Sequence, residues 1–286
     1  MNDTTTAYTT GMVTSADGAT IGYRQVGSGP GLILLHAGMH ASQHYMRLAA
    51  ALADTFTVYV PDRRGRGLSG PPGAQYSMAR ECEDVEALLT TTSSHFLFGH
   101  SSGGLIALQA ALTLPAVRKV AVYEPPLSVQ GSVPVSWVSR YEREVARGER
   151  AAALLTALKG LRVSRPTTVL PRWLLLPFIM WTLRREKQTR NPNDVSLEAL
   201  IPTQRLDMRL VNEMDGRLAR FTAMRAEVLL LGGKKSQMYL RKALDALQAT
   251  LPQVKRITYP DLHHRGPNET APERIAKDLR AFLRQG

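Results

Sequence analysis

The sequence predicts an α/β protein whose mostly parallel sheet is interrupted once by a helical insertion. Short apolar runs alternate with helical patterns up to about residue 125 and again from residue 223, which is typical of βαβ units. Between them, residues 126–222 show helical patterns and no clear strand. We therefore expect a core formed by residues 1–125 and 223–286, with a helical cap, or lid, formed by residues 126–222. A length of 286 residues suits such an arrangement.

The elements of the core follow from the order of these patterns. Two antiparallel strands are expected at residues 12–15 and 20–26, joined by a turn at Asp17-Gly18. Buried strands are expected at residues 31–36, 57–60, 95–98, 117–123, 227–231 and 254–259. Helices are expected at residues 43–54, 77–91, 104–114, 239–250 and 272–283, and Ser77 is suited to cap the second of them.

Composition excludes several classes of protein. Hydrophobic residues make up 44% and charged residues 21% of the chain, as in globular proteins. There is no apolar run long enough for a transmembrane helix and no signal-peptide pattern at the N-terminus, so we expect a soluble, cytoplasmic protein without stable membrane insertion. Cys82 is the only cysteine, which excludes internal disulfides and cysteine metal clusters. No metal or other cofactor is expected.

The net charge of +12 is unusual, and it is unevenly distributed. Residues 126–222 contain 16 lysines and arginines against 9 acidic residues, so more than half of the excess lies in the expected cap. No basic tail exists, and no basic stripe alternates with aromatic positions that could stack on bases. The sequence therefore predicts a small-molecule substrate rather than a nucleic acid, with positive charge around the substrate entrance. It does not indicate the oligomeric state.

The segment GHSSGG, residues 99–104, is the strongest motif in the chain. It has the form G-x-S-x-G, follows the strand expected at 95–98 and opens a helix rich in alanine and leucine. In that context the central Ser101 occupies a sharp turn, and the glycines let the strand and helix approach each other. Ser101 is therefore the expected nucleophile, at the N-terminus of a helix.

A nucleophilic serine needs a base, and the base needs a carboxylate that orients it. Late in the chain, histidines occur only in the loop after the strand expected at 254–259, as His263 and His264. We favour His264 because its P-x-L-x-H spacing resembles the common pattern for the base. His263 remains the alternative.

The usual position for the acid, after the strand expected at 227–231, holds glycines, lysines and a serine but no carboxylate. Glu124 instead ends the strand that follows the nucleophile helix, at the same edge of the sheet as Ser101. We therefore assign the acid to Glu124. Asp207 and Asp215 in the insertion are the next candidates, whereas Asp261 lies too close to His264 in sequence to orient it.

An oxyanion would need two backbone N–H donors. We expect one from Ser102, directly after the nucleophile, and one from Gly38 in the loop after the strand expected at 31–36, with Met39 as the alternative. His36, at the end of that strand, is expected to brace the loop rather than act as a base.

The segment PDRRGRGLSG, residues 61–70, contains three arginines that suggest either a phosphate site or a structural loop. We favour the structural interpretation, in which Asp62 pairs with an arginine and accepts hydrogen bonds from backbone amides.

These segments, in this order and spacing, resemble the α/β-hydrolase superfamily with a cap domain. The resemblance implies an eight-stranded, mostly parallel sheet and a triad of Ser101, His264 and Glu124 beneath a cap inserted after the sixth strand. The absence of an acid after the seventh strand departs from the usual family pattern. An acid after the sixth strand makes the layout similar to that of zearalenone-type lactone hydrolases, whereas dehalogenases would carry aspartate in place of Ser101.

The most apolar segment of the cap is RWLLLPFIMW, residues 172–181. We expect Trp173, Phe178 and Trp181 to pack in the cap and line the substrate pocket together with Met39. Docking on a membrane interface is the alternative.

Together these observations predict a serine hydrolase that cleaves a carboxylic ester or lactone through an acyl-enzyme on Ser101. The alternatives are a non-hydrolytic member of the same fold, such as an acyltransferase or lyase, and a catalytically weak ligand-binding member. The substrate itself is not indicated, because the cap that would select it has no recognisable pattern.

Overall fold

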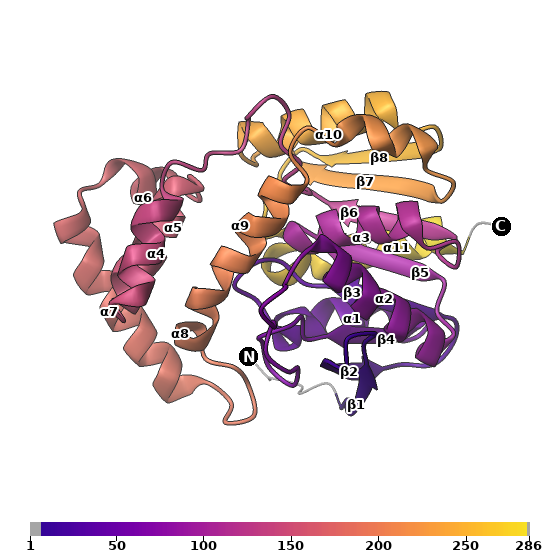
Figure 1. The fold of residues 1–286 in the computed structure, drawn as a ribbon, viewed down its shortest axis with the longest axis horizontal. Helices are drawn as coiled ribbons and strands as arrows, with labels where there is room; N and C mark the ends of the chain where they lie inside the picture. The colour runs from indigo at the N-terminus through magenta and orange to yellow at the C-terminus, as the bar shows by residue number, and fades with distance from the viewer. Residues whose placement is uncertain (1–6, 285–286) are drawn as a thin grey trace.

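In the computed structural model, which describes residues 7–284, the central sheet has eight strands in the order β1-β2-β4-β3-β5-β6-β7-β8 (Figure 1). β2 pairs antiparallel with β1 and β4, and all other neighbours are parallel. The mostly parallel sheet predicted from sequence is confirmed. The strands are β1 (Thr9–Thr14), β2 (Thr20–Val26), β3 (Gly31–Leu35), β4 (Thr57–Pro61), β5 (Phe96–His100), β6 (Lys119–Tyr123), β7 (Glu227–Gly233) and β8 (Val254–Tyr259).

The parallel strands carry apolar side chains on both faces, which is why helices cover both sides of the sheet. In β3, Leu32 and Leu34 belong to one apolar cluster, and Ile33 and Leu35 belong to the other. The first cluster includes residues of α1 (Met46–Leu52) and α11 (Pro272–Leu283). The second includes residues of α2 (Met78–Thr92), α3 (Ser102–Thr113) and α10 (Met238–Thr250). The alternation along each strand thus fixes the layers.

Several element boundaries differ from the sequence prediction because pairing across the sheet extends or shifts the strands. β5 begins at Phe96 and continues to His100, which is paired with Tyr123 of β6. β7 extends to Gly233, which is paired with Tyr259 of β8. The helix expected at 43–54 is instead a short turn of helix, η1 (Ser42–Tyr45), followed by α1.

Between β6 and β7 the described chain is helical, as predicted, and forms a separate layer beside the sheet (Figure 1). Its helices are α4 (Val138–Ala146), α5 (Arg150–Gly160), α6 (Arg165–Val169), α7 (Arg172–Thr189), α8 (Leu197–Leu200), η2 (Ile201–Thr203), α9 (Gln204–Glu213) and η3 (Leu218–Ala223). Across residues 7–284, every helix falls short of the length and apolarity needed to cross a bilayer.

The loop after β4 does not have the arrangement expected for Asp62. Its carboxylate accepts hydrogen bonds from the amides of Ser42 and Leu68, at 2.6 and 2.9 Å, and pairs with no arginine within residues 7–284. The predicted amide contacts are confirmed, but the predicted arginine partner is wrong. The arginines that follow it bind other carboxylates instead: Arg63 pairs with Glu81, Arg64 with Asp84 and Arg66 with Asp207.

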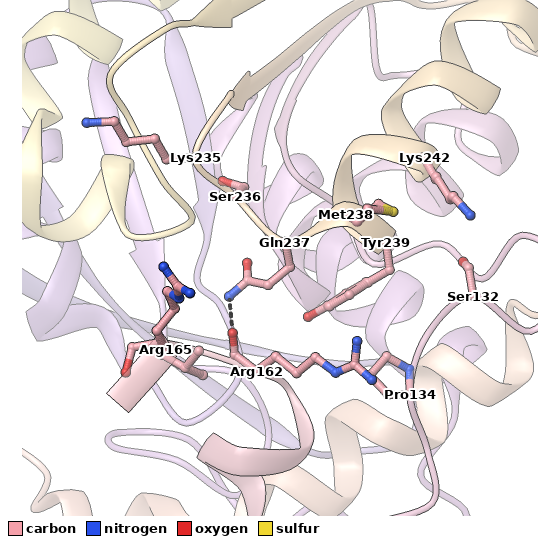
Figure 2. A pocket seen from close by; sticks show the side chains of 12 residues that line it. Ser132, Pro134, Arg162, Arg165, Lys235, Ser236, Gln237, Met238, Tyr239 and Lys242 are labelled. Atoms are coloured by element: carbon pink, nitrogen blue, oxygen red, sulfur yellow. Dashed lines mark hydrogen bonds between the residues drawn. The ribbon is translucent and has the colours of Figure 1, made fainter. Parts of the chain in front are cut away.

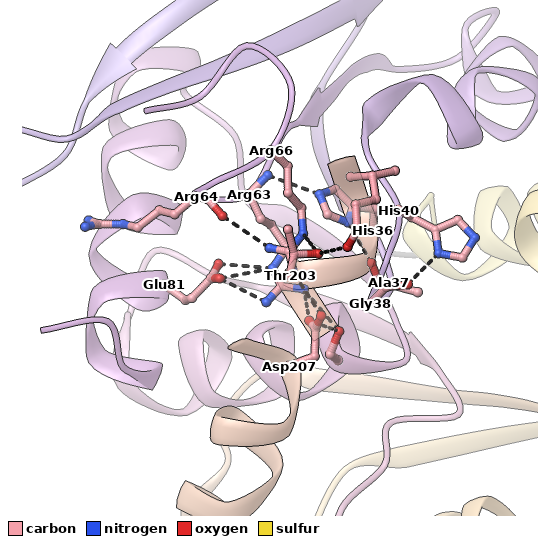
Figure 3. Close-up of polar contacts among 12 residues, drawn as sticks. His36, Ala37, Gly38, His40, Arg63, Arg64, Arg66, Glu81, Thr203 and Asp207 are labelled. Atoms are coloured by element: carbon pink, nitrogen blue, oxygen red, sulfur yellow. Dashed lines mark hydrogen bonds and ion pairs between the residues drawn. The ribbon is translucent and has the colours of Figure 1, made fainter. Parts of the chain in front are cut away.

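The arginines of this loop instead form a buried ion network that joins the core to the inserted helices (Figure 3). Arg63 binds Glu81 of α2 at 2.9 Å and Asp207 of α9 at 2.8 Å. Arg66 binds the other oxygen of Asp207 at 2.8 Å. Ser102 Oγ, at the start of α3, also donates to Asp207 at 2.8 Å. One carboxylate thus fixes α9 over the end of the sheet.

Burial raises the pKa of Asp207, but the Arg66 and Arg63 guanidinium groups outweigh it and hold the pKa below its usual range. Asp207 is therefore ionised at neutral pH. Its contribution to stability is full above the unfolded-state pKa of about 4 and is lost as the pH falls through the depressed folded-state pKa.

We expect Asp207→Asn to destabilise the protein by about 3–5 kcal/mol at pH 7, because it leaves two buried guanidinium groups without their shared carboxylate. Urea titration of both forms measures the difference. The difference should shrink as the pH falls below about 4, because the carboxylate of the unfolded chain then binds a proton while that of the folded protein is still ionised. Asp215→Asn, at an exposed position shortly after α9, is the matched control. Equal stability of the two variants would contradict a supporting role for the network.

Candidate active site

Ser101 lies between β5 and α3 in a strained backbone conformation, with φ 54° and ψ −123°. Its amide donates to the carbonyl of Tyr123 at 2.9 Å, which ties the turn to the neighbouring strand β6. A Cβ added at Gly99 would lie 2.3 Å from the carbonyl oxygen of Gly103, and one added at Gly103 would lie 2.4 Å from that of Leu35. The two glycines are therefore required sterically. They allow the sharp turn that presents Ser101 to a cavity at the C-terminal edge of the sheet.

Glu124 directly follows β6 and also has a positive φ, 49°. Its side chain is fully buried and crosses to the last residues of β7, which were expected from sequence to lie in the turn after that strand, and the amide of Gly233 donates to Oε1 at 2.6 Å. A Cβ at Gly232 would lie 3.2 Å from the Glu124 side chain. The carboxylate therefore reaches the turn in which the sequence lacks an acid, and glycines at this turn make room for it.

The other oxygen of Glu124, Oε2, lies 2.7 Å from Nδ1 of His264. His263 makes a different set of contacts. Its carbonyl accepts a hydrogen bond from the Tyr123 hydroxyl, and its Nδ1 accepts one from the Arg265 amide. Only His264 of the pair therefore contacts the buried carboxylate. His264 and Ser101 line the same cavity, and Ser101 Oγ has no hydrogen-bond partner in the described part of the chain.

The alternative acids are engaged elsewhere. Asp207 binds Arg63 and Arg66, as described above. Asp261 forms a two-pronged pair with Arg274 at 2.8 and 2.9 Å, and Asp215 is exposed. None of these carboxylates forms an ion pair or hydrogen bond with a histidine among residues 7–284.

Gly38 and Ser102 line the same cavity as Ser101. Ser102 is the first residue of α3, so its N–H has no acceptor within the helix. A Cβ at Gly38 would lie 2.8 Å from Gln204 and 3.0 Å from Asp207, so the close approach of α9 requires glycine here. Met39, the alternative donor, also lines the cavity and has a φ of 53°.

The histidines around this loop are held neutral. His36 Nε2 accepts from the Arg63 amide at 3.1 Å, so its Nδ1 donates to the carbonyl of Ala37 at 2.8 Å. This confirms the prediction that His36 braces the loop. Burial lowers the pKa of His100, and burial lowers that of His40 to about 3. The ionic state of the site thus depends little on these rings near neutral pH.

The cavity has a volume of about 410 Å³, with an apolar wall from the inserted helices. Trp173, Phe178 and Trp181 do not line it, and the structure corrects that expectation. They lie on α7 and are 75%, 60% and 52% exposed. The reason is that α5 and α9 stand between α7 and the sheet. The apolar side chains that do line the cavity are Met39, Val133, Leu158, Leu161, Val163, Met208 and Val211.

Sequence reasoning missed the polar side chains that support the site. His40 Nδ1 lies 2.7 Å from the Gly38 carbonyl, and its Nε2 lies 3.1 Å from Asn268 in the loop after His264. This contact links the two loops that border Ser101. No local pattern signals it, because the two residues are 228 positions apart. The sequence HAGMH does place a polar ring near the candidate oxyanion loop, which is the one signal that was present.

Comparisons with known proteins agree with this architecture. A structure described as an α/β hydrolase from Sphaerobacter thermophilus is 28% identical, with a TM-score of 0.77, and the alignment covers 96% of this chain and 100% of that one. An esterase from Rhodococcus, RhEst1, is 21% identical, with a TM-score of 0.69 and coverage of 96% and 98%. Likeness at that identity shows the fold alone.

A curated relative, an uncharacterised protein of Mycobacterium tuberculosis, is 37% identical over 95 residues. The match spans 32% of this chain and 28% of that protein, so it carries no information on activity. Residues 32–278 match the family described as the alpha/beta hydrolase family, which is most of the chain. With the sheet order, the Ser101 turn and the inserted helices, this match shows that the chain belongs to the α/β hydrolase family.

Proposed function

We propose that the protein is a serine hydrolase that cleaves a carboxylic ester or lactone through an acyl-enzyme on Ser101. The observation that carries the proposal is the 2.7 Å contact between His264 Nδ1 and the buried Glu124 carboxylate, at the wall of the cavity that Ser101 also lines. A carboxylate in this position holds the neutral imidazole with its proton on Nδ1. Nε2 is then free to accept the Ser101 proton.

The reaction divides into two steps. In the first, Ser101 Oγ attacks the substrate carbonyl while His264 Nε2 takes its proton, and then returns it to the departing alkoxide. The amides of Ser102 and Gly38 stabilise the oxyanion, each contributing about a hundredfold or more in rate. In the second, His264 removes a proton from water, which attacks the acyl group and releases the acid and Ser101. The apolar wall of the cavity favours an acyl or ring portion of moderate size.

We expect a fluorophosphonate probe to label the folded protein at Ser101 and nowhere else. The folded site activates only this hydroxyl, so heat-denatured protein should remain unlabelled. Peptide mass spectrometry distinguishes Ser101 from the adjacent Ser102, and Ser101→Ala should remove the label.

Labelling that survives Ser101→Ala would refute the assignment of the nucleophile. A folded protein that takes no label would favour a ligand-binding member of the fold. Hydrolysis in H₂¹⁸O separates the remaining alternatives, because the acid product gains one ¹⁸O only if water resolves the acyl-enzyme. Turnover without incorporation would indicate an acyltransferase or lyase.

We expect Glu124→Gln to lower kcat for ester hydrolysis by about 10³–10⁴-fold. The amide of Gly233 donates to Oε1, so a glutamine would keep its oxygen there and direct its NH₂ group towards His264 Nδ1. That orientation forces the proton onto Nε2, where it blocks proton transfer from Ser101. Steady-state kinetics with a p-nitrophenyl ester measure the loss.

Glu269→Gln, at an exposed carboxylate shortly after His264, is the matched control and should keep its activity. If Glu124→Gln folds normally and stays within a few fold of wild type, the acid lies elsewhere.

A further inference from the structure

A second cavity, which we call the basic groove, is lined by the residues drawn in Figure 2, and some of these also line the cavity of Ser101. It has a volume of about 480 Å³ and lies between residues 162–165, which follow α5, and residues 235–242, which lead into α10. Val163, Ser164, Lys235, Gln237 and Tyr239 line both this groove and the cavity of Ser101. The groove and the cavity of Ser101 therefore share one wall and lie next to each other.

The groove is lined by four cations and by no carboxylate. The cations are Arg162, Arg165, Lys235 and Lys242. None of them forms an ion pair or a side-chain hydrogen bond within residues 7–284, unlike the arginines that follow β4. Lys235 contributes only weakly to the lowered pKa of Asp261, because the main cause is the hydrogen bond of that carboxylate to Arg274. Four cations at one depression, without a counter-charge, create a positive potential that favours an anionic occupant.

Two polar groups at the junction of the groove and the cavity also lack partners. Ser236 is buried, and its hydroxyl has no hydrogen bond in the described chain. Gln237 donates through Nε2 to the carbonyl of Arg162 at 3.2 Å, while its Oε1 is buried and unpaired (Figure 2). Buried polar groups are normally satisfied, so these two point to a polar occupant. They lie where the groove and the cavity share lining residues.

We propose that the basic groove binds the anionic end of the substrate while the ester carbonyl lies at Ser101. This inference rests on the proposed ester hydrolase activity and names the substrate class: an ester with a carboxylate or phosphate on the side remote from the scissile bond. The anion interacts with the guanidinium and ammonium groups of the groove, and the apolar portion lies against the cavity wall.

Matched pairs of synthetic esters test this proposal. On the acyl side, a mono-p-nitrophenyl ester of a dicarboxylic acid is compared with its methyl-capped neutral counterpart. On the alcohol side, a 4-carboxyphenyl ester is compared with the 4-carbamoylphenyl ester, and a 4-phosphonophenyl ester extends the series to phosphorus. We expect kcat/KM to be about tenfold higher for the anionic member of at least one pair, and the preference to fall at about 0.5 M NaCl.

Arg165→Gln with Lys242→Gln should reduce that preference at least several fold and leave kcat/KM for neutral esters unchanged. Arg118→Gln with Lys277→Gln removes the same charge at exposed positions outside the groove, and should keep the preference. If both double variants lost the preference for anionic esters equally, the preference would come from the net charge of the protein, and the proposal that the groove binds the anion would be refuted. Hydrolysis of neutral esters without any anionic preference would also overturn it while the proposed function stands, whereas failure to hydrolyse every ester would refute the function itself.

A separate observation concerns α7, whose apolar side chains form an exposed row that we call the α7 stripe. It comprises the exposed apolar residues Trp173, Leu174, Phe178, Met180 and Trp181. The Phe178 and Trp181 rings are stacked at 5.9 Å, and the guanidinium of Arg185 lies 5.3 Å from the Trp181 ring. The helix lies at the outer edge of the inserted layer, away from the sheet (Figure 1). An exposed apolar patch of this kind marks an interaction surface.

The charges around the stripe select its partner. Arg184, Arg185 and Lys187 are exposed at the C-terminal end of α7. The single acid of α6 and α7 is Glu186, which already accepts from the Leu197 amide. A second copy of the chain would therefore bring cations against cations without supplying a free carboxylate from these helices. Aromatic side chains followed by arginines are instead typical of helices that lie in the interface of an anionic membrane.

We infer that the α7 stripe docks reversibly on an anionic lipid surface. We expect co-sedimentation with phosphatidylcholine vesicles that contain about one third phosphatidylglycerol, at least about tenfold stronger than with pure phosphatidylcholine and weakened by salt. Two of the three tryptophans lie on the stripe and the third, Trp137, is buried, so fluorescence should shift to the blue on binding.

Combined Trp173→Ser and Phe178→Ser substitution should abolish vesicle binding, whereas Met12→Ser, at another exposed apolar side chain, should not. Absence of binding to anionic vesicles by the wild-type protein would overturn the inference. So would a dimer in sedimentation velocity experiments that the stripe variant dissociates, because a second copy would then cover α7.

Discussion

The buried carboxylate of Glu124 holds together three segments that are distant in sequence: the end of β6, the end of β7 and the loop after β8. It does so with two short contacts, to the Gly233 amide at 2.6 Å and to His264 at 2.7 Å. A buried carboxylate is costly unless each oxygen has a partner, so the positions of the end of β7 and of the histidine are coupled. The positive φ of Glu124 and the absence of a side chain at Gly232 both serve this arrangement. The chain thus meets the same geometric requirement as an acid placed after β7, from a neighbouring strand.

The ion network around Asp207 plays the corresponding role for the inserted helices. It joins α9 to the loop after β4 and to Ser102, so the inserted helices are attached to the core at the residue next to Ser101. The ion network also borders the candidate oxyanion loop at Gly38, where the approach of Gln204 and Asp207 leaves no room for a side chain. Movement of α9 would therefore act on the candidate oxyanion loop and on Ser102 together. Binding in the cavity and the geometry of the reacting atoms are linked through these contacts.

The core could be predicted from sequence because its signals are local. Apolar runs between glycine-rich turns indicated every strand, and the G-x-S-x-G segment together with the missing acid after β7 led to Ser101 and Glu124 before any contact was known. The inserted helices could not be predicted in the same way. Trp137 and Trp173 both lie at helix starts in apolar surroundings, yet Trp137 is buried and Trp173 is 75% exposed. Which face of an inserted helix is covered depends on its packing against the other inserted helices and on contacts between these helices and the core, such as that of Arg63 with Asp207, 144 residues apart.

The excess of positive charge is easier to interpret when buried, paired arginines are separated from exposed, unpaired ones. Those that follow β4 are almost fully buried and bind carboxylates, so they add nothing to the external potential. Other cations form no ion pair among the described residues, and those around the basic groove and at the end of α7 are among them. Each group of cations lies beside an apolar surface. The basic groove adjoins the apolar wall of the cavity, and the cations at the end of α7 adjoin the α7 stripe. A ligand that satisfied either would have an apolar part and an anionic part. On the two inferences drawn above, the net charge of +12 favours amphiphilic anions as ligands.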